Sequence, residues 1–295
     1  SMIQEESDEF KEWMTAERIE SLNKGYWKNY ERYLSENGNY SKNVITKLGL
    51  NTDRIISKCG DPLNPKNWDR RGMVVGSVQS GKTSNYIGLI TKAADFGYKV
   101  IIVIAGIHEN LRKQTQERVE TDFIGFTEGQ KLELVKHGEV LFPEIDTTSK
   151  TPEIITTRNV DFIKAATNHI DPLNPRENPM VIVSKKNISV LKSIFNVFYK
   201  ENYDDLTRVT TRSENDKKTS SYNKIIKTKI QNLPLLFIDD EADYASINTK
   251  DLDQDPSAIN SIIRDILAMF KQKSYVAYTA TPYANIFILL QDKLS

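Results

Sequence analysis

The sequence predicts an α/β fold with a mostly parallel central sheet, and three observations indicate this class. First, short and nearly continuous apolar runs are typical of strands buried on both faces; they lie at 98–104, 180–184 and 235–238. Second, the segments between them carry apolar residues at helical spacing; these are 87–93, 190–198 and 259–270. Third, a glycine-containing turn joins a short apolar run at 73–75 to the first helical segment. This alternation favours βαβ units.

The composition limits the functional classes. The chain has 295 residues with 40 basic and 40 acidic side chains, so a wholly basic nucleic-acid binder is not expected, although a local basic groove remains possible. Cys59 is the single cysteine and the three histidines are scattered, which argues against a disulfide framework and a zinc site. No apolar run has the length of a membrane helix. We therefore expect a cytoplasmic protein without a membrane segment.

Two regions are expected. Residues 1–65 are predicted as a helical N-terminal region, because aromatic and aliphatic residues recur at helical spacing around Trp13, Tyr30 and Leu48. This region is interpreted as a packing layer, with a binding role as the alternative. Residues 66–295 are predicted as the α/β domain. Insertions are expected at about 121–178 and 201–222, where prolines or polar residues interrupt the pattern; the second is expected to be a mobile loop.

The turn at 76–83 reads Gly-Ser-Val-Gln-Ser-Gly-Lys-Thr and matches the phosphate-binding pattern G-x-x-x-x-G-K-[ST]. Its glycines permit a tight backbone turn, and the following helix directs its positive dipole end at an anion. A lysine in this place reaches the outer phosphates and the threonine hydroxyl ligates Mg²⁺. The residues expected to contact the ligand are Gly76, Gln79, Ser80, Gly81, Lys82, Thr83 and Ser84.

Two further segments carry weaker signals. Trp68 ends a loop with two prolines before the first strand, where it either stacks on an adenine ring or covers the edge of the core. The segment 110–119 is predicted as a polar helix rich in basic and amide side chains. Arg112, Gln114 and Arg118 either follow a nucleic-acid backbone or lie on a solvated surface.

The stretch 235–243 is an apolar run that ends in acidic residues. The carboxyl ends of parallel strands face the ligand crevice, so Asp240 is placed to hold Mg²⁺ and Glu241 to polarise the attacking water. At the end of the last predicted strand, 274–277, a second group of polar residues follows. Thr279 and Thr281 there either connect the acidic stretch with a neighbouring element or belong to an ordinary exit from the strand into a loop.

Together, Gly-Ser-Val-Gln-Ser-Gly-Lys-Thr at 76–83, Asp-Glu-Ala-Asp at 240–243 and Thr-Ala-Thr-Pro at 279–282 resemble motifs I, II and III of superfamily 2 helicases. The segment 102–119 is similar to their motif Ia. The longer stretches 78–83, 239–249 and 278–285 resemble the helicase-like part of bacterial Z1-domain proteins. Those proteins often carry an endonuclease label and are linked to restriction and phage defence.

The resemblance covers about residues 70–290. It implies a RecA-like P-loop domain, the cofactors ATP and Mg²⁺, and a DNA partner. It also implies that Lys82, Asp240 and Glu241 serve hydrolysis, and that Thr279 and Thr281 couple hydrolysis to movement. A second RecA-like lobe with an arginine finger and a Z1 region are expected beyond Ser295, so this chain is expected to be an N-terminal fragment with slow hydrolysis. The segment between Lys82 and Asp240 is longer than expected of a plain helicase core.

Three functions remain open at this stage. The first is an ATP-driven motor that acts on DNA. The second is an ATP-dependent switch or scaffold that recruits partners, although such a switch does not require the Thr-Ala-Thr-Pro stretch. The third is a nuclease, for which Asp216-Lys217-Lys218 is the best local candidate, in a polar segment without a surrounding apolar strand.

Overall fold

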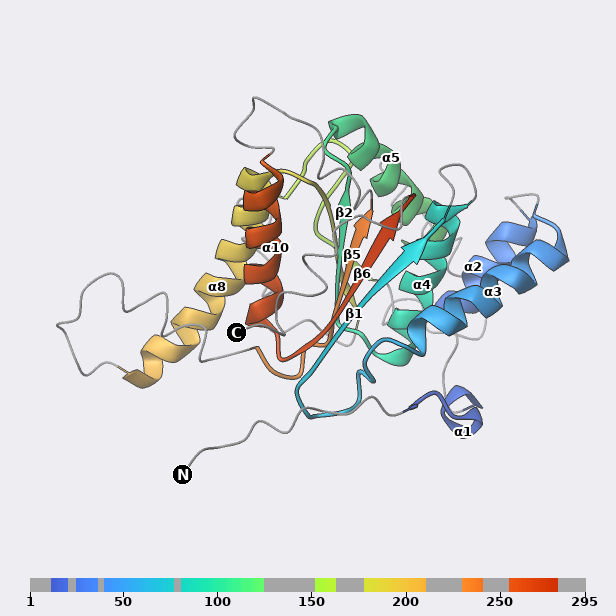
Figure 1. Cartoon of the computed structure of the whole chain (residues 1–295), viewed down its shortest axis with the longest axis horizontal. Helices are drawn as coiled ribbons and strands as arrows, with labels where there is room; N and C mark the ends of the chain where they lie inside the picture. Colours follow the sequence, from blue (N-terminus) through green and yellow to red (C-terminus); the bar gives the residue numbers. More distant parts are fainter. Residues whose placement is uncertain are drawn as a thin grey trace.

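The structure is a computed structural model, and it confirms the α/β class: in the part of the chain that it describes, six strands form an entirely parallel sheet in the order β1-β6-β5-β2-β4-β3 (Figure 1). It describes residues 12–20, 25–36, 40–76, 81–124, 152–162, 178–210, 230–240 and 255–280, with the backbone alone for 200–210. The strands are β1 (Trp68–Val75), β2 (Val100–Ala105), β3 (Glu153–Ile154), β4 (Met180–Lys185), β5 (Leu235–Asp240) and β6 (Gln272–Thr279).

Helices cover both faces of the sheet. They are α1 (Ala16–Glu20), α2 (Gly25–Glu36), α3 (Lys42–Ile56), α4 (Lys82–Phe96), α5 (Glu109–Val119) with the π-helical turn η1 (Glu120–Ile124), α8 (Ile188–Thr210) and α10 (Pro256–Met269). Figure 1 places α2 to α5 on one side of the sheet and α8 with α10 on the other. The helices that follow β1 and β2, α4 and α5, therefore lie on one face, whereas those that follow β4 and β5, α8 and α10, lie on the opposite face.

The central strands are buried on both faces. In β2, Ile102 and Ile104 belong to the apolar cluster under α8 and α10, while Ile101 and Val103 belong to the cluster under α4. This alternation follows from the two-residue period of a strand. It explains why the sequence of β2 has no polar face, as predicted for a parallel strand between two helical layers.

The N-terminal helices form a third layer that packs on α4. Lys92 of α4 reaches this layer, donating from Nζ to Gly49 O and Asp53 Oδ1, both at 2.6 Å, with the ammonium 4.2 Å from the centroid of the Trp27 ring. Helix α3 is present as predicted, but Val44 and Leu50 are exposed at 46% and 56%. The buried face of α3 instead consists of Ile45, Gly49, Thr52 and Ile56, because small residues let α3 approach α4 closely.

Both predicted insertions are partly regular structure. Helix α8 continues through Thr210, so residues 201–210 are helical and the predicted loop is wrong there. The misread signal is polarity, because a polar sequence alone does not exclude a helix. In the other insertion, residues 121–124 extend α5 as η1, and 153–154 form the edge strand β3 beside β4. The remaining predicted insertion residues, 125–151, 163–177 and 211–222, lie outside the described part of the chain.

Helix boundaries follow the capping signals. Gly97 ends α4 with φ 108°, a left-handed conformation that glycine adopts without strain. Asp255 accepts from the Ser257 backbone N–H at 2.9 Å, and Pro256 occupies the first helical position of α10. Both boundaries are as the sequence predicts. Strand β1 begins earlier than predicted, at Trp68, because β6 pairs with it along its full length.

Cys59 gives a direct test of this packing. Cys59 is 4% exposed as a residue, its Sγ lies 3.5 Å from Ile55 O, and burial raises the pKa of its thiol to about 12. The reactive thiolate is therefore rarer by about a thousandfold than for an ordinary cysteine. We expect iodoacetamide at pH 8 to label Cys59 only as urea unfolds the chain, as followed by mass spectrometry. Rapid labelling without urea would contradict the packing around residue 59.

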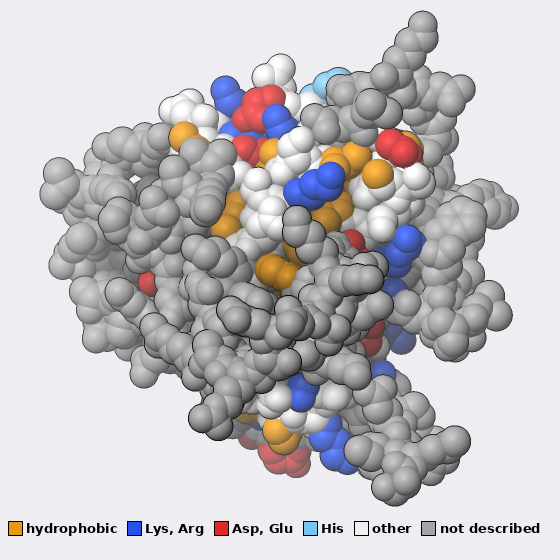
Figure 2. Space-filling view, turned by 90° about the vertical axis from the view of Figure 1, so that its left-hand side faces the viewer, with side chains coloured by type: hydrophobic (Ala, Val, Ile, Leu, Met, Phe, Trp, Pro, Cys, Tyr) orange, Lys and Arg blue, Asp and Glu red, His pale blue; other side chains and the backbone are white. Residues whose placement is uncertain are grey.

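The surface viewed from the side of α8 and α10 carries acidic and basic side chains together, with hydrophobic side chains between them (Figure 2). This mixture agrees with the formal net charge of zero. Among the described helices, none combines the length and the apolar character that a bilayer span requires.

Candidate nucleotide site

Three adjacent strands end at the same edge of the sheet, and each brings one predicted site segment. Val75 lies opposite Thr279 in the β1–β6 pairing, and Tyr278 lies opposite Asp240 in the β6–β5 pairing. The Gly76 N–H donates to Thr279 O at 3.0 Å, which ties the start of the glycine turn to the end of β6. Parallel pairing therefore places Gly76, Thr279 and Asp240 along one carboxyl edge, as expected for a ligand crevice.

The start of α4 has the backbone that the phosphate-binding pattern predicts. Gly81 caps the helix with φ 76° and ψ 23°, in the left-handed region that favours glycine. Lys82 and Thr83 are the first two helical residues, and both are partly exposed. The N-terminal N–H groups of a helix of this length attract an anion. Gln79 and Ser80 fall on 77–80, outside the described residues.

Buried tyrosines fix the first turn of α4 against the sheet. Tyr278 of β6 donates from its hydroxyl to Asn85 Oδ1 at 2.8 Å, and its ring packs on Tyr86 with centroids 5.7 Å apart. The pKa of Tyr86 is raised, first by burial and then by the charge of Asp240, against the smaller lowering effect of its hydrogen bonds with Thr115 and Thr83. Tyr86 thus touches Thr83 and lies within electrostatic reach of Asp240, so α4 and the end of β5 face each other.

The N-terminal layer also reaches this turn. The Tyr30 hydroxyl of α2 donates to Ser84 O at 3.1 Å, and the Tyr40 hydroxyl shares a hydrogen bond of 3.2 Å with Ser84 Oγ. Ser84 is buried, so these contacts place it in the support of the turn rather than in its mouth. The sequence assigned Ser84 to ligand contact, and the structure assigns it to the interface between α2 and α4.

The two consecutive aspartates at the end of β5 have different surroundings. Asp239 is fully buried, and it accepts from Lys186 Nζ at 2.7 Å and from the Tyr275 hydroxyl at 2.8 Å. Burial, followed by the charge of Asp239, raises the pKa of Tyr275, so the phenol stays protonated and donates. Asp240 is only partly buried. Asp239 is thus enclosed, whereas Asp240 retains access to the edge.

The structure describes only some of the residues for which coupling or catalytic roles are predicted. Thr279 is fully buried at the end of β6, between the ends of β1 and β5. Glu241 and Thr281 lie in 241–254 and 281–295, outside the described residues, so their predicted roles stay predictions.

Arg112 does not have the surroundings of a nucleic-acid contact. It is fully buried, and its guanidinium donates to Glu109 Oε1 at 2.8 Å, Thr157 O at 2.9 Å and Arg158 O at 2.7 Å. These partners hold the 152–162 segment against α5. Neither alternative of the sequence analysis, a phosphate contact or a solvated surface, describes Arg112: its donors point into the protein, where it serves as internal support.

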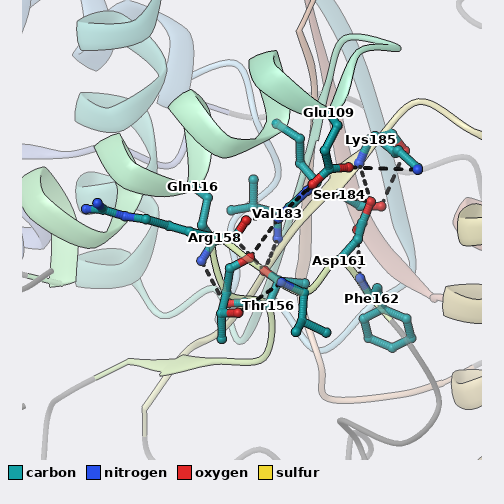
Figure 3. A network of polar contacts seen from close by, with 12 residues as sticks. Glu109, Gln116, Thr156, Arg158, Asp161, Phe162, Val183, Ser184 and Lys185 are labelled. Atoms are coloured by element: carbon teal, nitrogen blue, oxygen red, sulfur yellow. Dashed lines mark hydrogen bonds and ion pairs between the residues drawn. The ribbon is translucent and has the colours of Figure 1, made fainter. Parts of the chain in front are cut away.

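The same face of α5 carries more of this support (Figure 3). Gln116 donates from Nε2 to Thr156 O at 2.7 Å, and Thr156 returns a hydroxyl to Gln116 Oε1 at 2.9 Å. The Val183 N–H of β4 donates to Thr156 Oγ1 at 2.9 Å, so the network joins α5 to the sheet. Polar residues on a predicted surface helix thus serve as buried partners for an irregular segment.

The other two predicted nucleic-acid residues lie on the outer side of α5. Gln114 is exposed, and the side chain of Arg118 is 39% exposed and pairs with Asp122 at 2.7 Å. Their placement is compatible with either alternative of the sequence analysis. Trp68 is resolved differently: it is 3% exposed, with its ring 5.9 Å from that of Tyr98. Trp68 covers the core edge and presents no face to an adenine ring.

The donor set at this edge suits magnesium with a phosphate ligand. Thr83 offers a hydroxyl and Asp240 a carboxylate, and both are hard oxygen donors. Magnesium commonly takes only one or two carboxylates, because phosphates and water complete its shell. Across the described ranges, no group of three or more His, Cys, Asp or Glu side chains is placed to hold a metal. Asp216, the best nuclease candidate, lies outside those ranges.

Sequence reasoning missed the residues that support the site. The sequence analysis gave no supporting role to Tyr30, Tyr86, Tyr278 or Lys186. The one available signal was the pair of adjacent aspartates. Neighbouring residues on a strand point to opposite faces, so the second aspartate needs a partner on the other face. Comparison with protein-family models gives no match for this chain, and comparison with curated proteins gives no significant match.

Proposed function

We propose that this chain is an ATP-binding, Mg²⁺-dependent P-loop ATPase domain of the helicase type that acts on DNA. One observation carries the proposal: the glycine turn with Lys82 and Thr83, the Asp240 end of β5 and the Thr279 end of β6 share one edge of a parallel sheet. The resemblance of the three motifs adds the RecA-like assignment, DNA as partner, and a place in a restriction or phage-defence protein.

Each described residue has a part in this proposal. Lys82 neutralises the outer phosphates, and the first N–H groups of α4 bind them. Thr83 and Asp240 hold Mg²⁺, which when bound neutralises charge that develops on the transferred phosphoryl group. Tyr86 and Tyr278 pack on each other, and the Tyr278 hydroxyl donates to Asn85, so they hold the first turn of α4 against β6. Thr279 lies between the two phosphate-facing strands and transmits movement from one to the other.

The direct test is a titration with a fluorescent ATP analogue, with and without Mg²⁺, followed by anisotropy with single- and double-stranded oligonucleotides at fixed salt. We expect Mg²⁺-dependent binding of the analogue, binding of at least one oligonucleotide, and slow hydrolysis. Hydrolysis is expected to be slow because the resemblance assigns the arginine finger to a second lobe, and such fingers contribute about 10³ to 10⁵ in rate. A chain that binds no ATP analogue at any Mg²⁺ concentration contradicts the proposal.

A second candidate is a nucleotide-dependent switch, and the contact of α2 with the first turn of α4 favours it. Tyr30 and Tyr40 join the N-terminal layer directly to Ser84, next to Thr83. A ligand that shifts this turn therefore acts on α2 without any nucleic acid. Hydrogen exchange in α2 that changes with ATP, in a chain whose ATP binding ignores every oligonucleotide, would favour the switch over the motor.

A further inference from the structure

The end of β5 carries two adjacent aspartates, and only one of them can face the proposed magnesium site. Asp239 and Asp240 are chemically equal carboxylates on consecutive strand residues, so they point to opposite faces of the sheet. A slip of one residue in the pairing of β5 would exchange them. The neighbouring β6 register, Asp239 with Ala277 and Asp240 with Tyr278, offers no side-chain charge that would distinguish them.

The distinction comes from the face of α8 and α10. Tyr275 lies on that face, in the apolar cluster with residues of both helices, and its ring stacks on Phe237 with centroids 5.8 Å apart. From there its hydroxyl donates to Asp239 Oδ2 at 2.8 Å. Tyr86 and Tyr278, which sense the charge of Asp240, lie in the opposite cluster under α4.

The cation that pairs with Asp239 is Lys186, which lies just after β4. Lys186 is the first residue after β4, and its N–H donates to Ala105 O and Gly106 O, both at 3.1 Å, at the end of β2. Its side chain is 5% exposed and reaches past β2 to Asp239 at 2.7 Å. Two strands therefore anchor the backbone of Lys186 before its ammonium meets the carboxylate.

We propose that Lys186 and Tyr275 are positioning residues that decide which of the two aspartates faces the magnesium site, an inference that rests on the proposed function. They hold Asp239 on the α8 and α10 face, and Asp240 is thereby directed at α4 and Thr83. Stability alone is a weak reason for such a pair, since buried ion pairs are often no more stabilising than apolar residues of equal volume. We infer that the contribution of this pair is to fix the register of β5.

The test separates register from stability with two variants. Lys186→Met leaves Asp239 buried without its cation and is expected to lower stability. The double variant Lys186→Met/Asp239→Asn removes both charges and is expected to recover most of that loss. In both variants, the Mg²⁺ concentration for half-maximal binding of the fluorescent ATP analogue is expected to rise about tenfold or more, in the range seen when a supporting residue of a metal site is removed.

Lys185→Met is the matched control, because it makes the same change one residue earlier, at a side chain that is 30% exposed and lies 3.8 Å from Glu109. It should leave the Mg²⁺ midpoint unchanged. Hydrogen exchange without ligand adds a readout that needs no metal: the amides at the end of β5 should exchange faster in the double variant than in the control.

The outcomes are distinct. A stable double variant with the wild-type Mg²⁺ midpoint and wild-type exchange in β5 overturns the inference and leaves the proposed function intact. Failure of the unmodified chain to bind the analogue overturns the proposed function and this inference together.

Discussion

Lys82→Ala is expected to weaken binding of the ATP analogue about 10- to 100-fold, the equivalent of a lost hydrogen bond to a charged group. Hydrolysis, where measurable, is expected to fall by about 10² to 10³, because a preorganised donor to developing charge is removed. Lys82 is the first residue of α4, directly after the left-handed Gly81, at the end of the helix whose N–H groups favour an anion.

The fold should survive this change. Lys82 is partly exposed, alanine is the best helix former, and surface substitutions usually alter stability by less than about 0.5 kcal/mol. Lys47→Ala is the control, since Lys47 is an exposed lysine in the helix α3. Binding is measured by the same fluorescence titration, and stability by urea unfolding. Equal nucleotide affinity in the Lys82 and Lys47 variants would remove the glycine turn from the proposed site.

Arg112→Met is expected to lower the free energy of unfolding by about 3 to 5 kcal/mol. The guanidinium is fully buried, and its removal leaves two inward carbonyls, Thr157 O and Arg158 O, without their donor. Asp161, whose Oδ2 lies 3.7 Å from Arg112 Nε, also loses a cation; its pKa is already raised by burial against the lowering effect of Arg112. Chemical denaturation measures the loss.

Lys113→Met is the matched control, because residue 113 is the exposed neighbour on the same helix and should change stability by less than about 0.5 kcal/mol. Oligonucleotide anisotropy distinguishes the two interpretations of Arg112. A variant that unfolds at the wild-type urea concentration but loses DNA affinity would reinstate the nucleic-acid role. Lower stability with retained affinity, measured where the variant is still folded, supports the internal role.

Local patterns were sufficient for the central strands, for most of the helices that flank them and for the edge they share, but not for β3, η1 or the 201–210 part of α8. The apolar run at 98–104 predicted β2, and the order strand, glycine turn, helix predicted α4 with Gly97 at its end, because these signals act over a few residues. The parallel arrangement followed from the alternation of strands and helices. Carboxyl ends of parallel strands meet at one edge, so the proximity of the 76–83 turn to the end of β5 was also predictable.

Solvent exposure of single polar residues was not predictable in this way. Arg112 and Gln116 are charged or amide residues on a helix with few apolar positions, and a sequence alone assigns such residues to water. Their burial depends on the 152–162 segment, which is distant in the chain and needs hydrogen-bond partners for its backbone. The exposure of apolar residues has the same limit. Trp68 is buried against Tyr98, whereas Leu50 is exposed, and both outcomes depend on which distant residues pack nearby.

What the chain order alone decides is therefore the sequence of strands and helices, the glycine turn and the acids at the end of β5, because each depends on neighbouring residues. What only packing decides is which polar side chain is enclosed and by which partner. Asp239 and Asp240 illustrate the difference: adjacent and identical in sequence, they are distinguished by Lys186 and Tyr275, which long-range strand pairing brings to one of them.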